Sequence, residues 1–343
     1  MPSTPPLVSV ITPVYNGADY LEECVRSVLA QTYENWTYTI VNNCSTDRSR
    51  EIADAFASCD SRVRVLDTGS FLTAIASQEF ALRQASPHSV YTKVVFADDW
   101  LFRDCIDEMV TLAESHPNVG LVSAYGLYGT RVVWDGLPPS VNVVAGRELS
   151  RWRLLGGPYV FGTLTSMLVR TELLREVCAF RDHSNLQADT RACFELMQRS
   201  DFGFVHKVLT FTRSDNESTN SAAVRLATRY PAYLSDLQTF GPWCLSAGEL
   251  ERRLEEHLAD YYRFLADAAL HRRGADFWRF HADRMRKAGK PLDRIRLYRG
   301  IAARILDRVF NPKRTAESFI RGISRRKRAT EVRVPAVRQK EPS

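Results

Sequence analysis

The chain has 343 residues, of which 45% are hydrophobic and 25% are charged. These fractions are typical of a globular protein, and they exclude a collagenous, low-complexity or wholly disordered chain. The length exceeds what one small core needs and indicates a large α/β domain together with an accessory region.

Charge is distributed unevenly along the chain. From residue 270 onward there are 22 Lys and Arg against 7 Asp and Glu, whereas residues 1–269 contain 24 against 33. An acidic body with a basic tail predicts an anionic partner, for which a membrane surface and nucleic acid are the candidates.

Cysteine usage and hydropathy indicate the compartment. The seven cysteines are scattered and never spaced as CxxC, which argues against a disulfide framework and against a structural zinc site. No run of apolar residues is long enough to cross a membrane, and no basic segment precedes the first apolar run. We therefore expect a cytoplasmic protein without a signal peptide.

The first hundred residues alternate between strand and helix patterns. Because proline cannot continue a central strand ladder, the first strand is expected to end at Thr12 and Pro13. The alternation predicts a parallel sheet with right-handed crossovers, whose ligands bind beyond the carboxyl ends of the strands. Strands are predicted over residues 7–11, 36–41, 62–66 and 89–96, and helices over residues 20–31, from about 46, and over 73–85.

Helical patterns dominate the later part of the chain. A helix over residues 103–115 and a strand over 119–125 precede an irregular region at 126–160. A short strand and helix follow at 163–177, and another helix at 191–200. Residues 222–323 have helical periodicity, and residues 324–343 lack large apolar side chains, which predicts disorder there.

Four ordered motifs carry a resemblance to a known family. The segment VSVITPVYNGADYLEECVRSVLAQTYENWTYTIVNNCSTDRS resembles the N-terminus of family 2 glycosyltransferases, and FADDW, ADTRACFEL and VLTFTR follow in the family's order. The resemblance covers roughly residues 7–220. Within the first segment the matching residues are Tyr15, Asn16, Ser27, Gln31, Thr32, Ser45, Thr46 and Asp47.

This resemblance implies the GT-A fold, an α/β domain with a mostly parallel central sheet. The catalytic domain is expected over residues 1–221, with a nucleotide-sugar-binding half at 7–125 and an acceptor half at 126–221. A helical region at 222–323 and a basic tail at 324–343 would follow.

Asp98 and Asp99 end the fourth predicted strand, where two adjacent carboxylates would repel each other without a cation. Carboxylate oxygens suit Mg²⁺ or Mn²⁺, which would stabilise a departing nucleotide diphosphate. The resemblance implies that Asp98 contacts the ribose and the metal and that Asp99 ligates the metal. The family's further acidic residue is replaced by Phe96, which predicts weaker metal affinity. The alternative is that one carboxylate caps the following helix.

The donor site is also implied by the resemblance. Two amides, at Asn42 and Asn43, replace the family's usual acidic pair. An amide carbonyl can accept a hydrogen bond from uracil N3–H, so UDP is the expected nucleotide, with another base left open. The residues expected to bind the nucleotide are Pro13, Tyr15, Asn16, Asn43, Ser45 and Asp98.

Asp189 matches the carboxylate that the family uses as general base. Direct displacement at the anomeric carbon with one base gives inversion of configuration. The alternative is a structural role for Asp189 at a helix N-terminus. Where many members have a metal-binding His, this chain has Asp215 and Asn216, and His183 and His206 lie nearby in the sequence. Candidate stacking faces for the acceptor sugar are Trp152, Tyr159 and Phe161.

A basic amphipathic helix is predicted from about residue 293 to 310. One face carries Ile295, Tyr298, Ala302, Ile305 and Val309, with arginines around it. Such a helix can lie in an anionic membrane interface, here through residues 291–328, or it can pack on the catalytic domain. Nucleic acid is not expected as a partner, because no recognised binding module accompanies the charge.

The sequence therefore predicts an inverting, metal-dependent glycosyltransferase of the hexosyltransferase class. Its donor would be a UDP-sugar, and its acceptor a saccharide or lipid-linked saccharide in surface polysaccharide synthesis. We expect it in the cytoplasm, with peripheral binding to the inner face of the plasma membrane as a further hypothesis. The alternative is a non-catalytic glycosyltransferase-like protein that binds or scaffolds.

Overall fold

The computed structural model describes residues 4–177, 179–183, 185–213 and 220–310, and the predicted tail at 324–343 lies outside them. The chain divides into two compact units, Met1–Leu254 and Glu255–Ser343. The sequence placed a boundary after residue 221, whereas in the structure α9 (Arg229–Cys244) packs against α5 (Gly146–Leu154) within the first unit.

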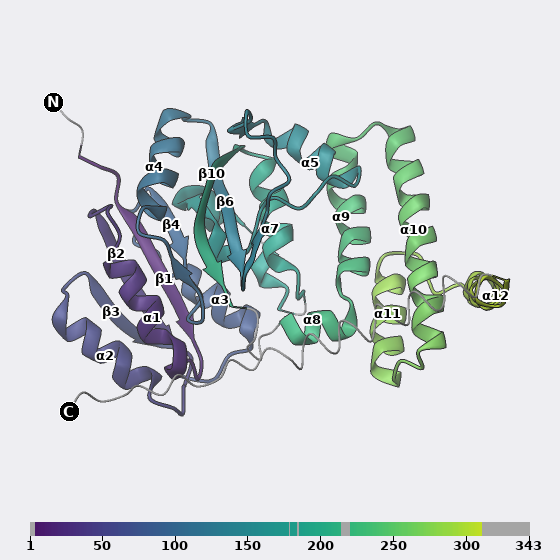
Figure 1. Ribbon diagram of the computed structural model, residues 1–343, viewed down its shortest axis with the longest axis horizontal. Coiled ribbons are helices and arrows are strands. Elements are labelled where there is room, and N and C mark those ends of the chain that lie inside the picture. Colours follow the sequence, from purple (N-terminus) through teal and green to yellow (C-terminus); the bar gives the residue numbers. More distant parts are fainter. Residues whose placement is uncertain (1–3, 178, 184, 214–219, 311–343) are drawn as a thin grey trace, which may run out of the picture. The chain divides into compact units, whose positions relative to one another are not determined.

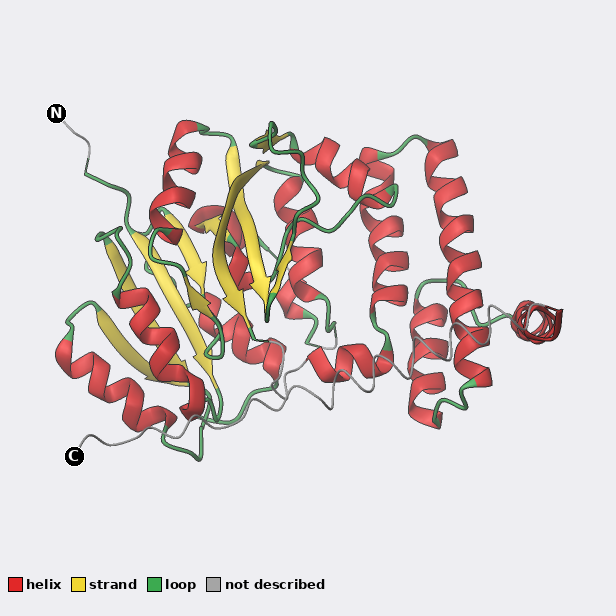
Figure 2. Cartoon of the chain, in the orientation of Figure 1, coloured by secondary structure: helices red, strands yellow, loops and turns green. Residues whose placement is uncertain are grey.

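A mixed sheet forms the centre of the first unit (Figures 1 and 2). The strand order is β3-β2-β1-β4-β9-β6-β10-β5, with β7 paired to β6 and β8 paired to β10. Strands β1 to β4 run parallel to one another, and β9 is antiparallel to both of its neighbours. The strands are β1 (Val8–Val14), β2 (Trp36–Asn42), β3 (Val63–Asp67), β4 (Tyr91–Val94), β5 (Trp100–Leu101), β6 (Val119–Tyr128), β7 (Arg131–Val133), β8 (Val143–Val144), β9 (Leu168–Arg170) and β10 (Asp201–Thr212).

Helices cover both faces of this sheet, because successive strand residues point to opposite sides. Val122 and Leu168 belong to a core shared with α1, α2 and α4, whereas Leu121 and Val169 belong to a second core shared with α3, α5 and α7. The helices of this unit are α1 (Ala18–Leu29), α2 (Ser49–Cys59), α3 (Ala74–Leu82), α4 (Cys105–Ser115), α5, α6 (Thr171–Glu176), α7 (Ala188–Met197), α8 (Asn220–Leu226) and α9, with short 3₁₀ turns at Leu164–Ser166 and Ala179–Arg181.

The expectation that the first strand stops before Pro13 is wrong. Strand β1 continues to Val14, and its register with β2 is unbroken. Val8 and Val14 form backbone hydrogen bonds on the β2 side, so the nitrogen of Pro13 faces the β4 side. Pairing between β1 and β4 has ended by Ile11 and Val94, and the missing N–H of proline therefore costs no ladder hydrogen bond.

The expectation of an irregular region at 126–160 is also wrong in part. Strand β6 extends to Tyr128, and β7, β8 and the two-and-a-half-turn helix α5 follow it. Helix α5 buries Gly146, Leu149, Ser150 and Leu154, a set with spacings of three and four residues that the neighbouring Gly and Pro residues obscured in the sequence.

The second unit is helical. It contains the part of α10 (Ala247–Leu270) that follows Leu254, together with α11 (Ala275–Lys287) and the described part of α12 (Arg294–Phe310). Aromatic side chains surround the buried His281 between α10 and α11. Helix α12 meets α10 through Gly300, Arg296 and Arg304, and it leaves six large apolar side chains between 46% and 77% exposed: Ile295, Tyr298, Ile305, Leu306, Val309 and Phe310.

Candidate active site

A cavity of about 1070 Å³ opens beyond the carboxyl ends of β1, β2 and β4. Parallel strands place their carboxyl ends at one edge of the sheet, so residues far apart in the sequence meet there. Pro13 lies near the end of β1, Tyr15 and Asn16 follow that strand, Asn43 follows β2, and Asp98 and Asp99 follow β4; all six line the cavity. Asp189 lines the same cavity from α7.

Asp99 is the more deeply placed of the two adjacent carboxylates, with 2% of its surface exposed. Its Oδ2 accepts a hydrogen bond from the Thr165 hydroxyl at 2.5 Å, and its Oδ1 accepts one from the Arg213 backbone N–H at 3.3 Å. Burial, and next the charge of Asp98, raise the pKa of Asp99 to about 7. A cation that binds beside a carboxyl group with a raised pKa stabilises its ionised form.

Neither carboxylate caps the next helix. Helix α4 begins at Cys105, with Asp104 at its N-cap position, and the short strand β5 stands between it and Asp99. The capping alternative raised by the sequence therefore does not account for Asp98 and Asp99.

A buried lysine supports the position of Asp99. Lys93 lies in β4 with no exposed surface, and its Nζ donates a hydrogen bond to the Thr165 carbonyl at 2.6 Å. The Thr165 hydroxyl also accepts from the Phe96 backbone N–H at 3.1 Å. Burial lowers the pKa of Lys93. Sequence reasoning missed Lys93 as a site residue, although a single lysine within an apolar strand was the available signal.

Asp98 and Asp99 are the residues at this edge that could hold a divalent cation. Two carboxylates offer hard oxygen donors, which Mg²⁺ and Mn²⁺ prefer. In the described ranges no group of three or more His, Cys, Asp or Glu side chains is placed to hold a metal. Asp215 and Asn216 lie outside the described residues.

The two histidines considered from sequence have other surroundings. His206 forms a hydrogen bond with the Tyr125 hydroxyl through Nδ1, at 2.8 Å, and another with the Val141 carbonyl through Nε2. His183 pairs with Glu79 at 2.8 Å. Neither histidine is among the residues that line the cavity.

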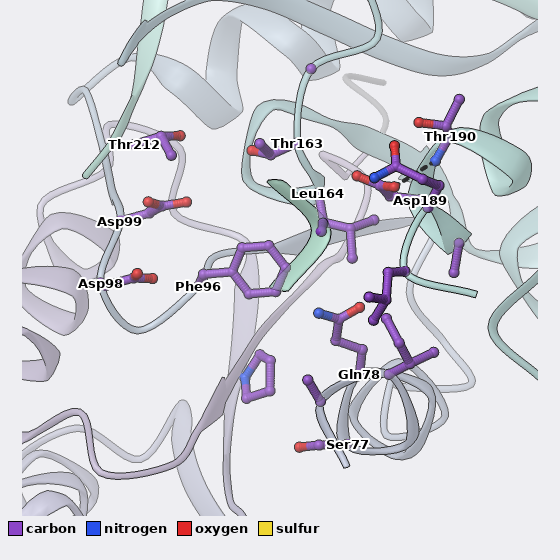
Figure 3. Close-up of a pocket in the computed structure, with 18 of the residues that line it drawn as sticks. Ser77, Gln78, Phe96, Asp98, Asp99, Thr163, Leu164, Asp189, Thr190 and Thr212 are labelled. Atoms are coloured by element: carbon purple, nitrogen blue, oxygen red, sulfur yellow. Dashed lines mark hydrogen bonds between the residues drawn. The ribbon is translucent and has the colours of Figure 1, made fainter. Parts of the chain in front are cut away.

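Asp189 faces the cavity from the first turn of α7, where Gln187 is the N-cap residue. Its Oδ1 accepts a hydrogen bond from the Thr190 backbone N–H at 2.8 Å. Burial raises the pKa of Asp189 despite this hydrogen bond. Figure 3 shows Asp98 and Asp99 on one side of the cavity and Asp189 on the other, with Phe96 and Leu164 between them.

The loops after β1 and β2 are tied together by their motif residues. Asn16 has a positive φ of 47°, its N–H donates to the Ser45 hydroxyl at 3.1 Å, and its Oδ1 accepts from the Thr46 N–H at 2.8 Å. Asp47 accepts from the Ala18 N–H at the start of α1. Ser45 holds the loop in this way and is not among the cavity-lining residues.

Asn43 lines the cavity with an amide that already has partners. Its Oδ1 accepts from the Leu72 N–H at 2.8 Å and from the Thr68 hydroxyl at 3.2 Å, and its Nδ2 donates to the Leu72 carbonyl at 2.9 Å. The amide retains one N–H for a ligand. Near it, the exposed rings of Tyr15 and Phe71 contact each other edge to face, with centroids 4.9 Å apart.

The other end of the cavity contains side chains that sequence reasoning missed. Arg153 comes from α5, and Tyr233 and Asp236 come from α9. Of the three aromatic residues proposed as stacking faces, Tyr159 lines the cavity, whereas Phe161 is fully buried and Trp152 packs at the edge of the second core. No local pattern marked Asp236, because it appeared only as one acidic residue in a helical region.

The fold and this cavity define a class of protein. A parallel half-sheet with polar loops at its carboxyl edge, an acidic pair after β4 and a separate carboxylate on α7 agree with a GT-A type fold. The fold is similar to that of S. aureus TarS, with a TM-score of 0.56, 17% identity, and coverage of 74% of this chain and 43% of TarS. It is also similar to a TarS fragment in complex with UDP-GlcNAc, with a TM-score of 0.54, 17% identity, and coverage of 75% and 73%.

The sequence comparisons identify the family. Residues 9–178 match the model of glycosyl transferase family 2. A putative teichuronic acid biosynthesis glycosyltransferase of Bacillus subtilis, TuaG, is 30% identical over 167 residues, which cover 49% of this chain and 64% of TuaG. Glycosyltransferase GlyG of Streptococcus pneumoniae is 29% identical over 181 residues, covering 50% and 59%. The chain belongs to glycosyltransferase family 2, and it spans less than two thirds of the length of these two relatives.

Proposed function

We propose that this protein transfers a hexose from a UDP-sugar to a hydroxyl of a saccharide or lipid-linked saccharide, with inversion, in the synthesis of a cell-surface polysaccharide. One observation carries the proposal: a single cavity contains the Asp98 and Asp99 carboxylates on one side and Asp189 on the other (Figure 3). With this separation, Asp98 and Asp99 could act at the leaving diphosphate while Asp189 acts on the attacking hydroxyl. The names of TuaG and TarS support the choice of surface polysaccharide and UDP donor.

Asp189 is the proposed general base. Its raised pKa strengthens its affinity for the proton that an acceptor hydroxyl loses as it attacks. The acceptor oxygen forms a bond to the anomeric carbon as the bond from that carbon to the diphosphate oxygen breaks, and the proton moves to Asp189. Attack opposite the leaving group inverts the configuration.

Asp98 and Asp99 are the residues that would hold a divalent cation. Such a cation, when bound, would neutralise charge that develops on the departing diphosphate. The Thr165 hydroxyl and the Arg213 N–H orient Asp99 toward this task. The aromatic pair of Tyr15 and Phe71 would flank the nucleobase, and the remaining N–H of Asn43 would contact it.

The test combines binding with turnover. Calorimetric titration of UDP, GDP and dTDP, with and without Mn²⁺, should give the tightest binding for UDP with the cation. Asp189→Asn should keep UDP binding and lose transfer by about 10²-fold to 10⁴-fold. Asp98→Asn should weaken UDP binding in the presence of Mn²⁺. Tight UDP binding with no turnover of any UDP-sugar by the wild type would favour the non-catalytic scaffold instead.

We also propose that α12 binds the anionic inner face of the plasma membrane. No helix in the described part of the chain has both the length and the hydrophobicity required to span a bilayer. Helix α12 instead exposes Ile305 and Val309 beside arginines such as Arg299, the arrangement of a helix that lies in the interface. Each Lys or Arg near such a surface contributes roughly 1 kcal/mol. A lipid-linked acceptor would be presented at the same surface.

Vesicle cosedimentation of the full chain tests this proposal. Binding should increase with the phosphatidylglycerol content of phosphatidylcholine vesicles and decrease as salt screens the charge. The double variant Ile305→Ser and Val309→Ser should bind at least several-fold more weakly, whereas Val132→Ser, an exposed apolar change in β7, should have no effect. Equal binding by the double variant and the control would disprove a role for α12.

A further inference from the structure

The end of the cavity opposite the nucleotide loops contains a buried carboxylate that the proposed reaction does not use. Asp236 lies on α9 and lines the cavity with only 5% of its surface exposed. It has no hydrogen bond to any residue that the structure describes. A buried carboxylate in this state is costly unless donors reach it from the cavity. Water or the hydroxyl groups of a ligand are the donors that can do so.

Arg153 lies close to this carboxylate and is also incompletely satisfied. Its Nη1 donates to the Gly157 carbonyl at 3.1 Å, whereas its Nε is buried and lacks a hydrogen-bond partner among the described residues. Its guanidinium lies 5.3 Å from the ring centroid of Tyr233 and 5.7 Å from that of Tyr159. The cavity wall therefore offers an acceptor on Asp236, a donor on Arg153 and aromatic faces beside them.

Hydrogen bonds and a ring contact fix the positions of the aromatic side chains at this end. The Tyr159 hydroxyl donates to the Gly162 carbonyl at 3.0 Å, and its ring contacts Trp134 edge to face at 5.5 Å. The Tyr233 hydroxyl donates to the Leu154 carbonyl at 2.7 Å. Fixed aromatic faces next to one hydrogen-bond donor and one acceptor are the usual composition of a small-molecule pocket.

We propose that Asp236 and Arg153 bind the hydroxyl groups of a neutral sugar ring of the acceptor, with Tyr159 and Tyr233 against its apolar face. This inference rests on the proposed transferase function, since it names the acceptor class for the cavity of Asp189. We expect the ring to be neutral because the two carboxylates of Asp189 and Asp236 outnumber the one guanidinium of Arg153 in this part of the cavity, and an acidic sugar would add another negative charge. Burial raises the pKa of Asp236 to about 7. The charges of Arg191 and Arg153 lower this pKa, whereas the charge of Asp189 raises it.

The assignment makes α9 part of the acceptor site. The family match ends at residue 178, so α9 is outside the segment that defines the family. Acceptor choice would then depend on a helix outside the segment that matches the family.

A matched pair of probes tests the proposal on the full chain. Methyl β-glucoside and methyl β-glucuronide differ at C6, where one carries a neutral hydroxymethyl group and the other a carboxylate. Binding is measured by ligand-observed NMR with UDP and Mn²⁺ present, and UDP binding is measured separately by calorimetry. The variants are Asp236→Asn and Arg153→Met, and the control is Thr239→Ala, an exposed position on α9 that does not line the cavity.

The expected result is that the wild type and the control bind the glucoside more tightly than the glucuronide. Each variant should weaken glucoside binding about 10-fold to 100-fold, the range for a hydrogen bond to a charged group, and leave UDP binding within about twofold. No glucoside binding by the wild type, unchanged glucoside binding by both variants, or tighter binding of the glucuronide would overturn the proposal. Failure of the wild type to bind UDP would instead count against the proposed transferase function, so the two failures are distinguishable.

Discussion

Asp236 should make the stability of the fold depend on pH in a predictable direction. Its ordinary pKa is 3.8, and burial raises the pKa to about 7 in the folded protein. Because the folded state binds this proton more tightly than the unfolded state, the contribution of Asp236 to stability is complete below about pH 4 and is lost as the pH rises to about 7. The variant Asp236→Asn has no proton to lose and avoids this cost.

The size of the effect follows from the two pKa values. Each pH unit between them corresponds to about 1.4 kcal/mol, so the full cost of ionising Asp236 is on the order of 4 kcal/mol. We therefore expect the free energy of unfolding of Asp236→Asn to exceed that of the wild type by a margin that grows from about pH 4 to about pH 7 and is constant above that. A stabilised variant with weaker sugar binding would also exclude misfolding as the cause of its functional defect.

The assay is urea unfolding across pH 5 to 8, followed by tryptophan fluorescence. The control Asp54→Asn removes an exposed carboxyl from α2 that forms a surface ion pair with Arg50, and it should change stability by less than about 0.5 kcal/mol at every pH. A margin that does not vary with pH, or a variant less stable than the wild type at pH 8, would refute the reasoning.

Two other substitutions test contacts at the end of the cavity proposed for the nucleotide. Thr165→Val removes the hydroxyl that donates to Asp99, and it should lower the free energy of unfolding by about 1–3 kcal/mol and turnover at least tenfold. The matched control Thr171→Val changes a buried threonine of α6 outside the cavity and should lose stability but keep its turnover. Equal turnover of the two variants would show that Thr165 has no role in the reaction. Asn43→Asp places a carboxylate against the Leu72 carbonyl and should lower the free energy of unfolding by about 1–3 kcal/mol with weaker UDP binding, whereas unchanged UDP titration would show that Asn43 does not contact the nucleotide.

Much of the half-sheet formed by β1 to β4, the part proposed to bind the nucleotide, was predictable from local sequence patterns. Hydrophobic alternation predicted the strands β1 to β4, and a parallel arrangement requires their carboxyl ends to meet at one edge. Asn43, Asp98 and Asp99 were therefore expected to lie near one another irrespective of how the rest of the chain folds. In the structure all three line one cavity. The family motifs extended this reasoning to Asp189 on α7.

Tertiary structure decided what depends on contacts between distant segments. Pro13 lies inside β1 because β4 ends early on that side, which no local pattern reveals. The Asn43 amide is committed to the loop at Leu72, and Lys93 is buried against Thr165, through hydrogen bonds that span 29 and 72 residues.

The end of the cavity proposed for the acceptor shows most clearly what local sequence patterns cannot predict. Arg153 and Asp236 are 83 positions apart in the sequence and come from helices α5 and α9, whose packing against each other brings both side chains to one cavity. A sequence pattern reports which face of a helix is apolar, but not which polar residue at its edge will face a cavity. That outcome depends on how the helices pack, and here the packing of α5 against α9 placed a buried carboxylate beside the proposed catalytic base.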